Sequence, residues 1–491
     1  MPLSHPFLRR HGLMLAFAVT LAACFLVYVR YNQRYIGAVD WYGYYQQGML
    51  FKSGRVTLPV DLPATKFPAA VPLGYFVTAA GKVAPQYPPG FPLLIAAAAL
   101  VHLEFYLQPL VGLASCLVMF WLIRDLTADR VTAVIFAVLW GCCPLVVYGS
   151  TMMMSDLEAA LFLLLSYRCY RQGRVAWSAV ALVFAGSVRP TNVLYLVVFL
   201  PVLWRDRRLW RFALGLALPG AAFAIYNQYL YGAPWRTGYQ NLSYDLVTGF
   251  FGSHLAFYLQ QCLWQFSPVV VVLAGLGLRQ RRPERWFFVS WFAVFLLFYC
   301  FWRPAEDAWW WTRFLLPGFA PIFFLAAIGF SRLRAPAGER PAGSRAWRPG
   351  WLACFGLTLL TPVYFVGFGL YQHDLWSLHK GEAYYDVVRA TEALVPPGSY
   401  VGSIEFAGSF RTYSPLRPFL SFHDNAPALI RQVLKNGHAV FLLVEPWNKS
   451  HLGIERLLHE FSAEKIRVLN FWGGIPLYQL TVPAGPKPPA P

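Results

Sequence analysis

The sequence has few charged residues, and few of those are acidic. Only 13% of its 491 residues are charged, with 23 Asp and Glu against 41 Lys and Arg, whereas soluble proteins are about 25% charged. Hydrophobic residues make up 57% of the chain, and the mean hydropathy is +0.45. A soluble core cannot bury that much apolar surface. The composition therefore excludes an ordinary soluble domain and predicts an α-helical polytopic membrane protein.

Cysteine is absent from the C-terminal part of the chain. All eight cysteines lie in or beside apolar runs, and the last 120 residues contain none. Neither a Cys-x-x-Cys nor a His-x-x-x-His spacing occurs. These absences argue against a disulfide framework and against a structural zinc site.

The net charge of +18 does not indicate a nucleic-acid partner, because of where the charge lies. The last 120 residues are nearly balanced, with 11 basic and 10 acidic residues. Arginines instead gather in short loops between apolar runs, such as 205–208 and 279–282. This is the positive-inside pattern of a membrane protein. A complete glycine-rich nucleotide loop is also lacking, since Gly402-Ser403 alone is more typical of a plain turn.

About eleven apolar stretches predict membrane-spanning helices. The first follows Arg9-Arg10, which predicts a cytoplasmic N-terminus, and arginine-rich loops then recur on that side throughout. We expect a membrane domain over 1–375, with outer loops at 30–105 and 231–262 and an interfacial or re-entrant helix at 91–101. The predicted spans are 12–29, 106–123, 131–149, 157–170, 175–188, 191–204, 212–230, 263–278, 286–302, 314–330 and 351–371.

Residues 376–484 predict a small extracytoplasmic α/β domain, because eleven spans separate them from a cytoplasmic N-terminus. Strand-like runs alternate with helical stretches, which favours a mainly parallel sheet. The Pro-rich tail 485–491 predicts disorder. The expected strands are 400–404, 439–444, 466–469 and 477–480, and the expected helices are 381–395, 424–436 and 451–461.

The first outer loop contains a short aromatic segment that predicts an amphipathic helix from Asp40 to Lys52. Asp40, Tyr44 and Gln47 share one helical face, and Gly54 is a typical helix end. Asp40 near the helix start is favoured by the helix dipole. Two interpretations are open: an interfacial anchor with a capping aspartate, or a charged base held at the membrane surface.

Other charged residues also fall near the outer ends of predicted spans, where charge is costly and often functional. Asp156 opens a span, as a cap or as a functional acid, and we expect Glu158 to reach toward the interface. The pair Glu306-Asp307 either binds a cation or an acceptor or only solvates its loop. Trp311 either stacks on a sugar ring or belongs to the aromatic belt. Four basic residues could bind a lipid phosphate: Lys66, Arg189, Arg303 and Arg313.

Several short motifs follow one another in or beside the predicted outer loops. They are Asp40 with Tyr44-Tyr45 and Lys52-Ser-Gly54, Tyr87-Pro-Pro-Gly90, Ser155-Asp156, Arg189-Pro190, Tyr231-Gly-Ala-Pro234 with Thr237-Gly-Tyr239, and Arg313-Phe-Leu-Leu-Pro317. Their order and sidedness resemble the GT-C class of polyprenyl-phosphate-sugar-dependent glycosyltransferases. The likeness extends over about residues 12–371, and it is strongest to bacterial relatives of protein O-mannosyltransferases and of the lipid A aminoarabinose transferase.

The resemblance implies a bacterial inner-membrane glycosyltransferase that acts on the periplasmic face. Its donor would be a polyprenyl-phosphate-linked sugar and its acceptor a glycan, lipid or protein. Divalent cation use stays open. A transporter or flippase for a lipid-linked glycan and a non-catalytic partner with the same fold are the alternatives. The implied roles are Asp40 as general base, Asp156 as support for the acceptor or a cation, Arg189, Arg303, Arg313 and Lys66 as phosphate ligands, and Tyr44, Tyr87, Glu306, Asp307 and Trp311 as acceptor or sugar ligands.

Overall fold

The computed structural model describes residues 6–483, except 61, 240–245, 303–307, 335–347, 373–374, 447–450 and 472. The predicted tail 485–491 lies outside the described residues. The chain divides into two compact units. A helical unit contains Met1–Asn32, Tyr106–Phe223 and Asn241–Leu378, and a mixed unit contains Gln33–Phe105, Ala224–Gln240 and His379–Pro491. The first predicted outer loop thus belongs to the same compact unit as the C-terminal residues.

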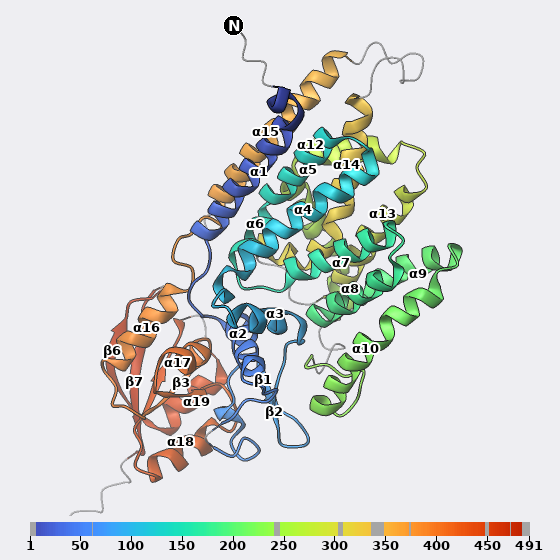
Figure 1. Cartoon of the computed structure of the whole chain (residues 1–491). Helices are drawn as coiled ribbons and strands as arrows, with labels where there is room; N and C mark the ends of the chain where they lie inside the picture. The colour runs from blue at the N-terminus through green and yellow to red at the C-terminus, as the bar shows by residue number, and fades with distance from the viewer. Residues whose placement is uncertain are drawn as a thin grey trace, which may run out of the picture. The chain divides into compact units, whose positions relative to one another are not determined.

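Each predicted membrane span coincides with one or more helices of the structure (Figure 1). The helix α10 runs from the helical unit into the mixed unit. The elements are α1 Pro6–Arg30, α4 Leu107–Thr127, α5 Arg130–Cys142, α6 Pro144–Thr151, α7 Asp156–Arg171, α8 Val175–Val188, η3 Pro190–Leu194, α9 Tyr195–Arg205, α10 Leu209–Tyr231, η4 Thr248–Phe250, α12 Phe251–Leu278, α13 Glu284–Tyr299, η5 Trp309–Leu315, α14 Leu316–Arg334 and α15 Arg348–Tyr371.

Five helical stretches in the described part of the chain are long and apolar enough to cross a membrane. The pair α5 and α6, bent by 61° at Pro144, would add a sixth as one broken span. The prediction of a mostly helical, multi-pass membrane protein is confirmed, while the count of eleven crossings stays a prediction. The five stretches are Gly12–Arg30, Glu104–Thr127, Leu209–Tyr231, Thr248–Leu278 and Trp309–Arg334.

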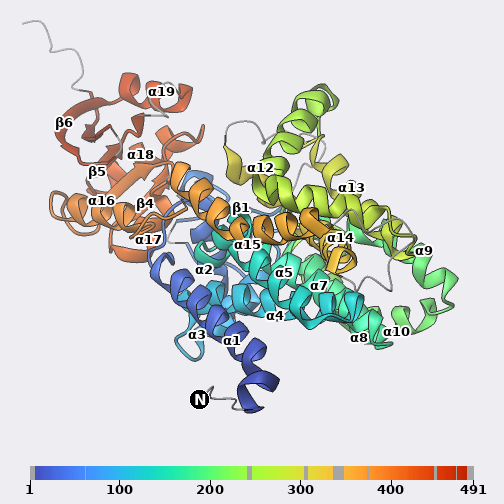
Figure 2. The same cartoon turned by 90° about the horizontal axis from the view of Figure 1, so that it is seen from above.

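The helix α14 forms the centre of the helical unit, with α12, α13, α7 and α4 packed around it (Figure 2). Two glycines let α12 and α14 touch backbone to backbone. A Cβ atom on Gly277 would lie 2.0 Å from the Leu325 carbonyl oxygen, and one on Gly329 would lie 2.1 Å from that of Leu273. Small residues at helix contacts are typical of membrane proteins, where close packing replaces the hydrophobic effect.

The N-terminal part of the mixed unit consists of α2 Val39–Lys52, η1 Pro68–Ala70, the hairpin of β1 Tyr75–Val77 and β2 Val83–Pro85, and α3 Gly90–Ala99. The predicted helix over 40–52 is confirmed, and Gly54 follows its end with a φ of +72°. Helix α2 packs on α3 where Gly48 faces Ile95, whose Cγ2 atom would lie 2.7 Å from an added Cβ.

The C-terminal part of the mixed unit, from residue 379 on, contains a five-stranded mixed sheet with strand order β4-β3-β5-β7-β6, and this part is called the C-terminal domain below. Strand β3 is parallel to β4 and β5, whereas β7 is antiparallel to β5 and β6. The domain comprises α16 Glu382–Glu392, β3 Tyr400–Ser403, α17 Ala407–Tyr413, β4 Arg417–Leu420, α18 Ala426–Lys435, β5 Val440–Leu443, α19 Leu452–Glu460, β6 Ser462–Leu469 and β7 Ile475–Thr481.

The expectation of a mainly parallel sheet is therefore only half right. Gly473 and Gly474 both have positive φ, +87° and +84°, between β6 and β7. They end the short loop between Leu469 and Ile475, which are paired across the two strands. A short loop of this kind can join antiparallel strands, and glycine adopts positive φ without steric cost. The two glycines were the sequence signal for an antiparallel pair.

Both faces of the sheet are covered, which explains why β5 is apolar throughout. Val440 and Leu442 pack in a core cluster with residues of α18 and α19. Phe441 and Leu443 point to the opposite cluster, with residues of α16 and α17. Phe67, next to η1, joins the first cluster. The loop before β1 is thereby part of the core of the C-terminal domain.

Candidate active site

Asp40 lies in the first turn of α2 and accepts a hydrogen bond from a buried tyrosine. The Tyr87 hydroxyl donates to Asp40 Oδ1 at 2.7 Å. Burial raises the pKa of Tyr87 well above its usual range, and the nearby Asp40 carboxylate raises it further. The phenol therefore stays protonated, and its O–H group donates the hydrogen bond to the carboxylate. The structure joins two predicted site residues that lie 47 positions apart.

Aromatic rings form the wall behind this pair. The Tyr44 ring lies 4.5 Å from the Tyr87 ring and 5.0 Å from the Phe91 ring, centroid to centroid. Tyr44 is only 5% exposed, so its side chain packs in the wall. Gly43 makes room for the Tyr87 ring, because an added Cβ would lie 2.1 Å from its Cε2 atom.

In the helical unit, Asp156 and two arginines form a second buried group. Asp156 opens α7 and is 2% exposed. Arg189, directly after α8, donates to Asp156 Oδ1 through Nη1. Arg313 in η5 lies beside the other oxygen, with Nε 3.6 Å from Asp156 Oδ2. One carboxylate and two guanidiniums leave this group with a net charge of +1, which favours an anionic ligand.

Aromatic rings hold both guanidiniums from the side. The Arg189 guanidinium lies 4.7 Å from the centroid of the Phe314 ring, and the Arg313 guanidinium lies 5.0 Å from the same ring. Arg313 also stacks against Trp310 and Trp311 at 4.8 and 5.2 Å. Contacts of this kind fix a planar guanidinium without consuming its N–H donors.

Glu158, two residues after Asp156 on α7, is an acidic residue whose burial the sequence reasoning missed. The expectation that it reaches toward the interface is wrong, because Glu158 is fully buried. Its carboxylate lies near the side chain of Gln108 in α4. The available signal was the spacing of two acids, Asp156 and Glu158, at the start of an apolar helix.

The remaining predicted site residues are not brought into either group. Arg303, Glu306 and Asp307 lie outside the described residues. Lys66 is exposed, and its ammonium lies 5.3 Å from the Phe67 ring centroid, beside the core of the C-terminal domain. Within the part of the chain that the structure describes, there is no group of three or more His, Cys, Asp or Glu side chains that could bind a metal ion.

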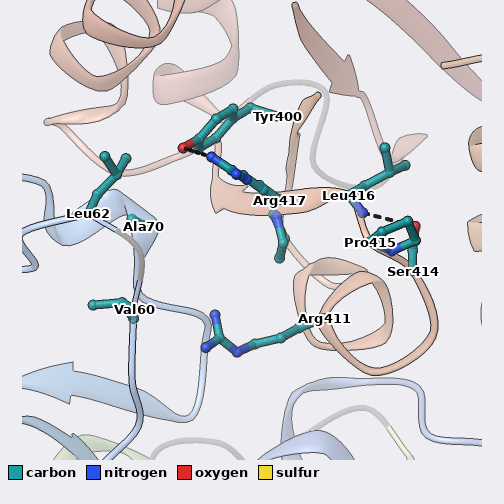
Figure 3. A pocket seen from close by; sticks show the side chains of 10 residues that line it. Val60, Leu62, Ala70, Tyr400, Arg411, Ser414, Pro415, Leu416 and Arg417 are labelled. Carbon is teal, nitrogen blue, oxygen red and sulfur yellow. Dashed lines mark hydrogen bonds between the residues drawn. The ribbon is translucent and has the colours of Figure 1, made fainter. Parts of the chain in front are cut away.

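A cavity of about 290 Å³ lies in the mixed unit, between the loop before β1 and the starts of β3 and β4 (Figure 3). Arg411 and Arg417 extend into it, and Arg417 donates to the Tyr400 hydroxyl at 3.2 Å. None of the predicted site residues lines this cavity. It is therefore distinct from the pair of Asp40 and Tyr87.

No protein-family model and no curated protein matches the chain. Solved structures do match it. ArnT from Cupriavidus metallidurans in the apo state matches with a TM-score of 0.59 at 15% identity, over 96% of this chain and 98% of that one. The oligosaccharyltransferase AglB from Archaeoglobus fulgidus matches with a TM-score of 0.56 at 12% identity, over 89% of this chain and 70% of that one. The mycobacterial arabinofuranosyltransferase AftD matches with a TM-score of 0.53 at 14% identity, over 94% of this chain and 41% of that one.

The chain has a GT-C-like fold. This confirms the resemblance indicated by the short motifs of the sequence. The match to ArnT spans nearly the full length of both chains, so the likeness includes the five-stranded sheet as well as the helical unit. At 15% identity, the likeness is one of fold alone.

Proposed function

We propose that this chain is a membrane glycosyltransferase that transfers a sugar from a polyprenyl-phosphate donor to an acceptor hydroxyl. The observation that carries the proposal is the buried group of Asp156, Arg189 and Arg313, with its net positive charge. Arginine forks match the oxygens of a phosphate. Two structures with this fold hold lipid phosphates, since ArnT was solved bound to undecaprenyl phosphate and AglB in complex with a dolichol-phosphate.

The reaction would exchange one bond at the anomeric carbon of the donor sugar. The acceptor oxygen forms a bond to that carbon, the bond to the phosphate oxygen breaks, and its electron pair stays on the departing lipid phosphate. Arg189 and Arg313 would stabilise the charge that develops there, as fixed donors do in a site shielded from water. Asp156 would hold the two guanidiniums in place, in addition to the support for an acceptor or cation expected from the sequence.

Asp40 would take the proton of the acceptor hydroxyl as that oxygen attacks. A positioned base of this kind typically accelerates a reaction about 10²–10⁴-fold. The hydrogen bond from Tyr87 restricts the rotation of the Asp40 side chain, so the base is already oriented before the acceptor binds. We propose that the transfer occurs on the outer face of a bacterial inner membrane, as the distribution of arginines in the loops predicts.

Lipid and glycan analysis of a strain that lacks the gene tests this function. We expect an unused lipid-linked sugar to accumulate on the outer face, and one glycoconjugate to lose a sugar. Wild-type protein should restore both, and Asp40→Asn protein should restore neither. Accumulation of the lipid-linked sugar on the cytoplasmic face alone would instead support a flippase.

Reporter fusions test the location. A reporter fused after residue 375 should be active only in the periplasm. Activity in the cytoplasm would contradict the proposed sidedness of the transfer.

A further inference from the structure

The C-terminal domain holds the backbone of Ile36, four residues before Asp40. The Ile36 N–H donates to the Tyr413 hydroxyl at 2.6 Å, and the Ser409 hydroxyl donates to the Ile36 carbonyl at 3.2 Å. Both side chains come from α17, and Ile36 is fully buried. One short helix of the C-terminal domain thus satisfies both backbone groups at the entrance to α2, where unmade hydrogen bonds would be costly.

Two glycines bring the same domain into direct contact with this entrance. A Cβ atom on Gly408 of α17 would lie 2.3 Å from Cγ of Tyr42. A Cβ atom on Gly37 would lie 2.4 Å from the ring of Tyr384 in α16. Real Cβ atoms do not come this close to other atoms, so the surfaces match with no spare room. The fit fixes the path of the chain from Ile36 into α2.

The backbone between Ile36 and Asp40 is strained. Ala38 caps the start of α2 with a φ of +36° and a ψ of +167°, a region that residues with a Cβ atom rarely adopt. Such a conformation persists only where the surrounding structure over-determines it. Here Ala38 packs against the core cluster of the C-terminal domain that contains Tyr384 and Phe406.

This constraint determines where the Asp40 carboxylate lies. Asp40 is in the first turn of α2, two residues after Ala38. A rotation of the backbone at 36–38 would reorient the first turn of α2. The Asp40 carboxylate would then move away from the Tyr87 hydroxyl, to which it is now hydrogen-bonded at 2.7 Å. Every residue in this chain of contacts belongs to the mixed unit.

We infer that the C-terminal domain holds the Asp40 carboxylate in its working position, with Tyr413 and Ser409 as positioning residues. The inference rests on the proposed role of Asp40 as the base. General base catalysis requires rigid placement, because small displacements of a reacting group lower the rate steeply. This gives a function to a domain that supplies no reacting group in the proposed transfer.

The test uses full-length protein purified in detergent. Membranes of the gene-deletion strain supply the unused donor and acceptor. Tyr413→Phe removes the acceptor of the Ile36 N–H and keeps the ring that packs on Tyr385, and Ser409→Ala removes the second bond with a smaller change in volume. We expect Tyr413→Phe to lower the apparent kcat about tenfold, and the apparent KM for the membrane extract to stay within about twofold. Tyr400→Phe is the matched control, since its hydroxyl bonds within the same domain, and its rate should equal that of the wild type.

A double-mutant cycle with Asp40→Asn separates positioning from a merely structural role. If Tyr413 acts through Asp40, adding Tyr413→Phe to the Asp40→Asn protein should lower the remaining rate by at most about twofold. Hydrogen exchange of amides 36–42 should speed up in Tyr413→Phe and in the double variant, and should not change in Tyr400→Phe.

Wild-type rates and wild-type exchange in both Tyr413→Phe and Ser409→Ala would overturn the inference. A tenfold fall in rate when Tyr413→Phe is added to the Asp40→Asn protein would also overturn it. Full activity of Asp40→Asn alone would overturn the proposed function instead.

Discussion

The Tyr87 hydroxyl donates a 2.7 Å hydrogen bond to the Asp40 carboxylate, and the two residues come from different ends of the first loop. Tyr87 lies just before α3, whereas Asp40 lies in the first turn of α2. Hydrogen bonds to charged groups stabilise a protein by about 1.5–3 kcal/mol. The bond therefore fixes the carboxylate and also ties the start of α2 to the approach to α3.

Asp40→Asn should abolish most of the transfer and leave the fold intact. Asparagine keeps the size of the side chain and an oxygen that accepts from Tyr87, but it cannot take a proton at neutral pH. We expect the rate to fall at least about a hundredfold, with an unchanged unfolding temperature. Sugar transfer in membranes of a complemented deletion strain measures this. Asp386→Asn, the same exchange at an exposed position of α16, is the control. Normal transfer by Asp40→Asn would reduce α2 to an anchor.

Tyr87→Phe should lower the rate about tenfold, because the base loses the donor that orients it. The ring contact with Tyr44 is kept. Tyr75→Phe is a matched control, since Tyr75 is buried in the same unit and its hydroxyl has no hydrogen-bond partner in the described part of the chain. Initial rates of the two purified variants make the comparison. Equal rates for both would show that the bond to Asp40 does not matter for transfer.

Arg313→Lys should weaken the use of the lipid-linked donor about tenfold. Lysine keeps the positive charge but loses the planar fork and the stacking on Trp310 and Trp311. Asp156 keeps its bond to Arg189, so no buried carboxylate is left unpaired. Native mass spectrometry with undecaprenyl phosphate and the initial rate give two independent readings.

The control for Arg313→Lys is Arg334→Lys. Arg334 ends α14 and pairs with Asp129 at 2.7 Å, so it matches Arg313 in chemistry without belonging to the proposed site. Similar lipid binding by both variants would contradict the assignment of Arg313 to the phosphate.

Glu445 should make the C-terminal domain less stable as the pH rises. Burial raises the pKa of Glu445 from 4.5 to about 7, against the backbone N–H groups of Ile404 and Glu405, which lower it. Between pH 4.5 and 7 the folded state holds a proton that the unfolded state releases. Stability therefore falls across this range, by about 3 kcal/mol at most. Glu445→Gln removes the titration and keeps an oxygen that accepts both N–H groups. Thermal unfolding from pH 5 to 8 should show the difference, and parallel pH profiles for the two proteins would contradict it.

The sequence predicts the elements whose signals are local. The helix over 40–52 follows from its 3.6-residue period and from Gly54. Four strands, β3, β5, β6 and β7, follow from short strand-like runs. It does not predict β4, whose four residues include Pro418. Proline is tolerated there because β4 is an edge strand. It also misses α17, which is only seven residues long and has no clear period.

The candidate site shows the same division. The cost of charge near membrane helix ends was enough to select Asp156, Arg189 and Arg313 one by one. Their mutual pairing depends on tertiary packing, because Arg313 lies in η5, far along the sequence from the neighbouring helices α7 and α8. Glu158 is buried, although the sequence predicted that it reaches toward the interface, and the cause is the same. Burial inside the bundle depends on the neighbouring helices and not on the helix that bears the residue.

The bond between Ile36 and Tyr413 joins residues 377 positions apart, which has a consequence for biosynthesis. Ribosomes add about 5–20 residues per second, so the entrance to α2 is synthesised roughly 20–75 seconds before its partner Tyr413. Until then the strained turn at Ala38 lacks the contacts that hold it. Every nascent or prematurely terminated chain that ends before α17 would therefore carry the Asp40 segment without these contacts, and the proposed base would be held in place only after α17 has been made.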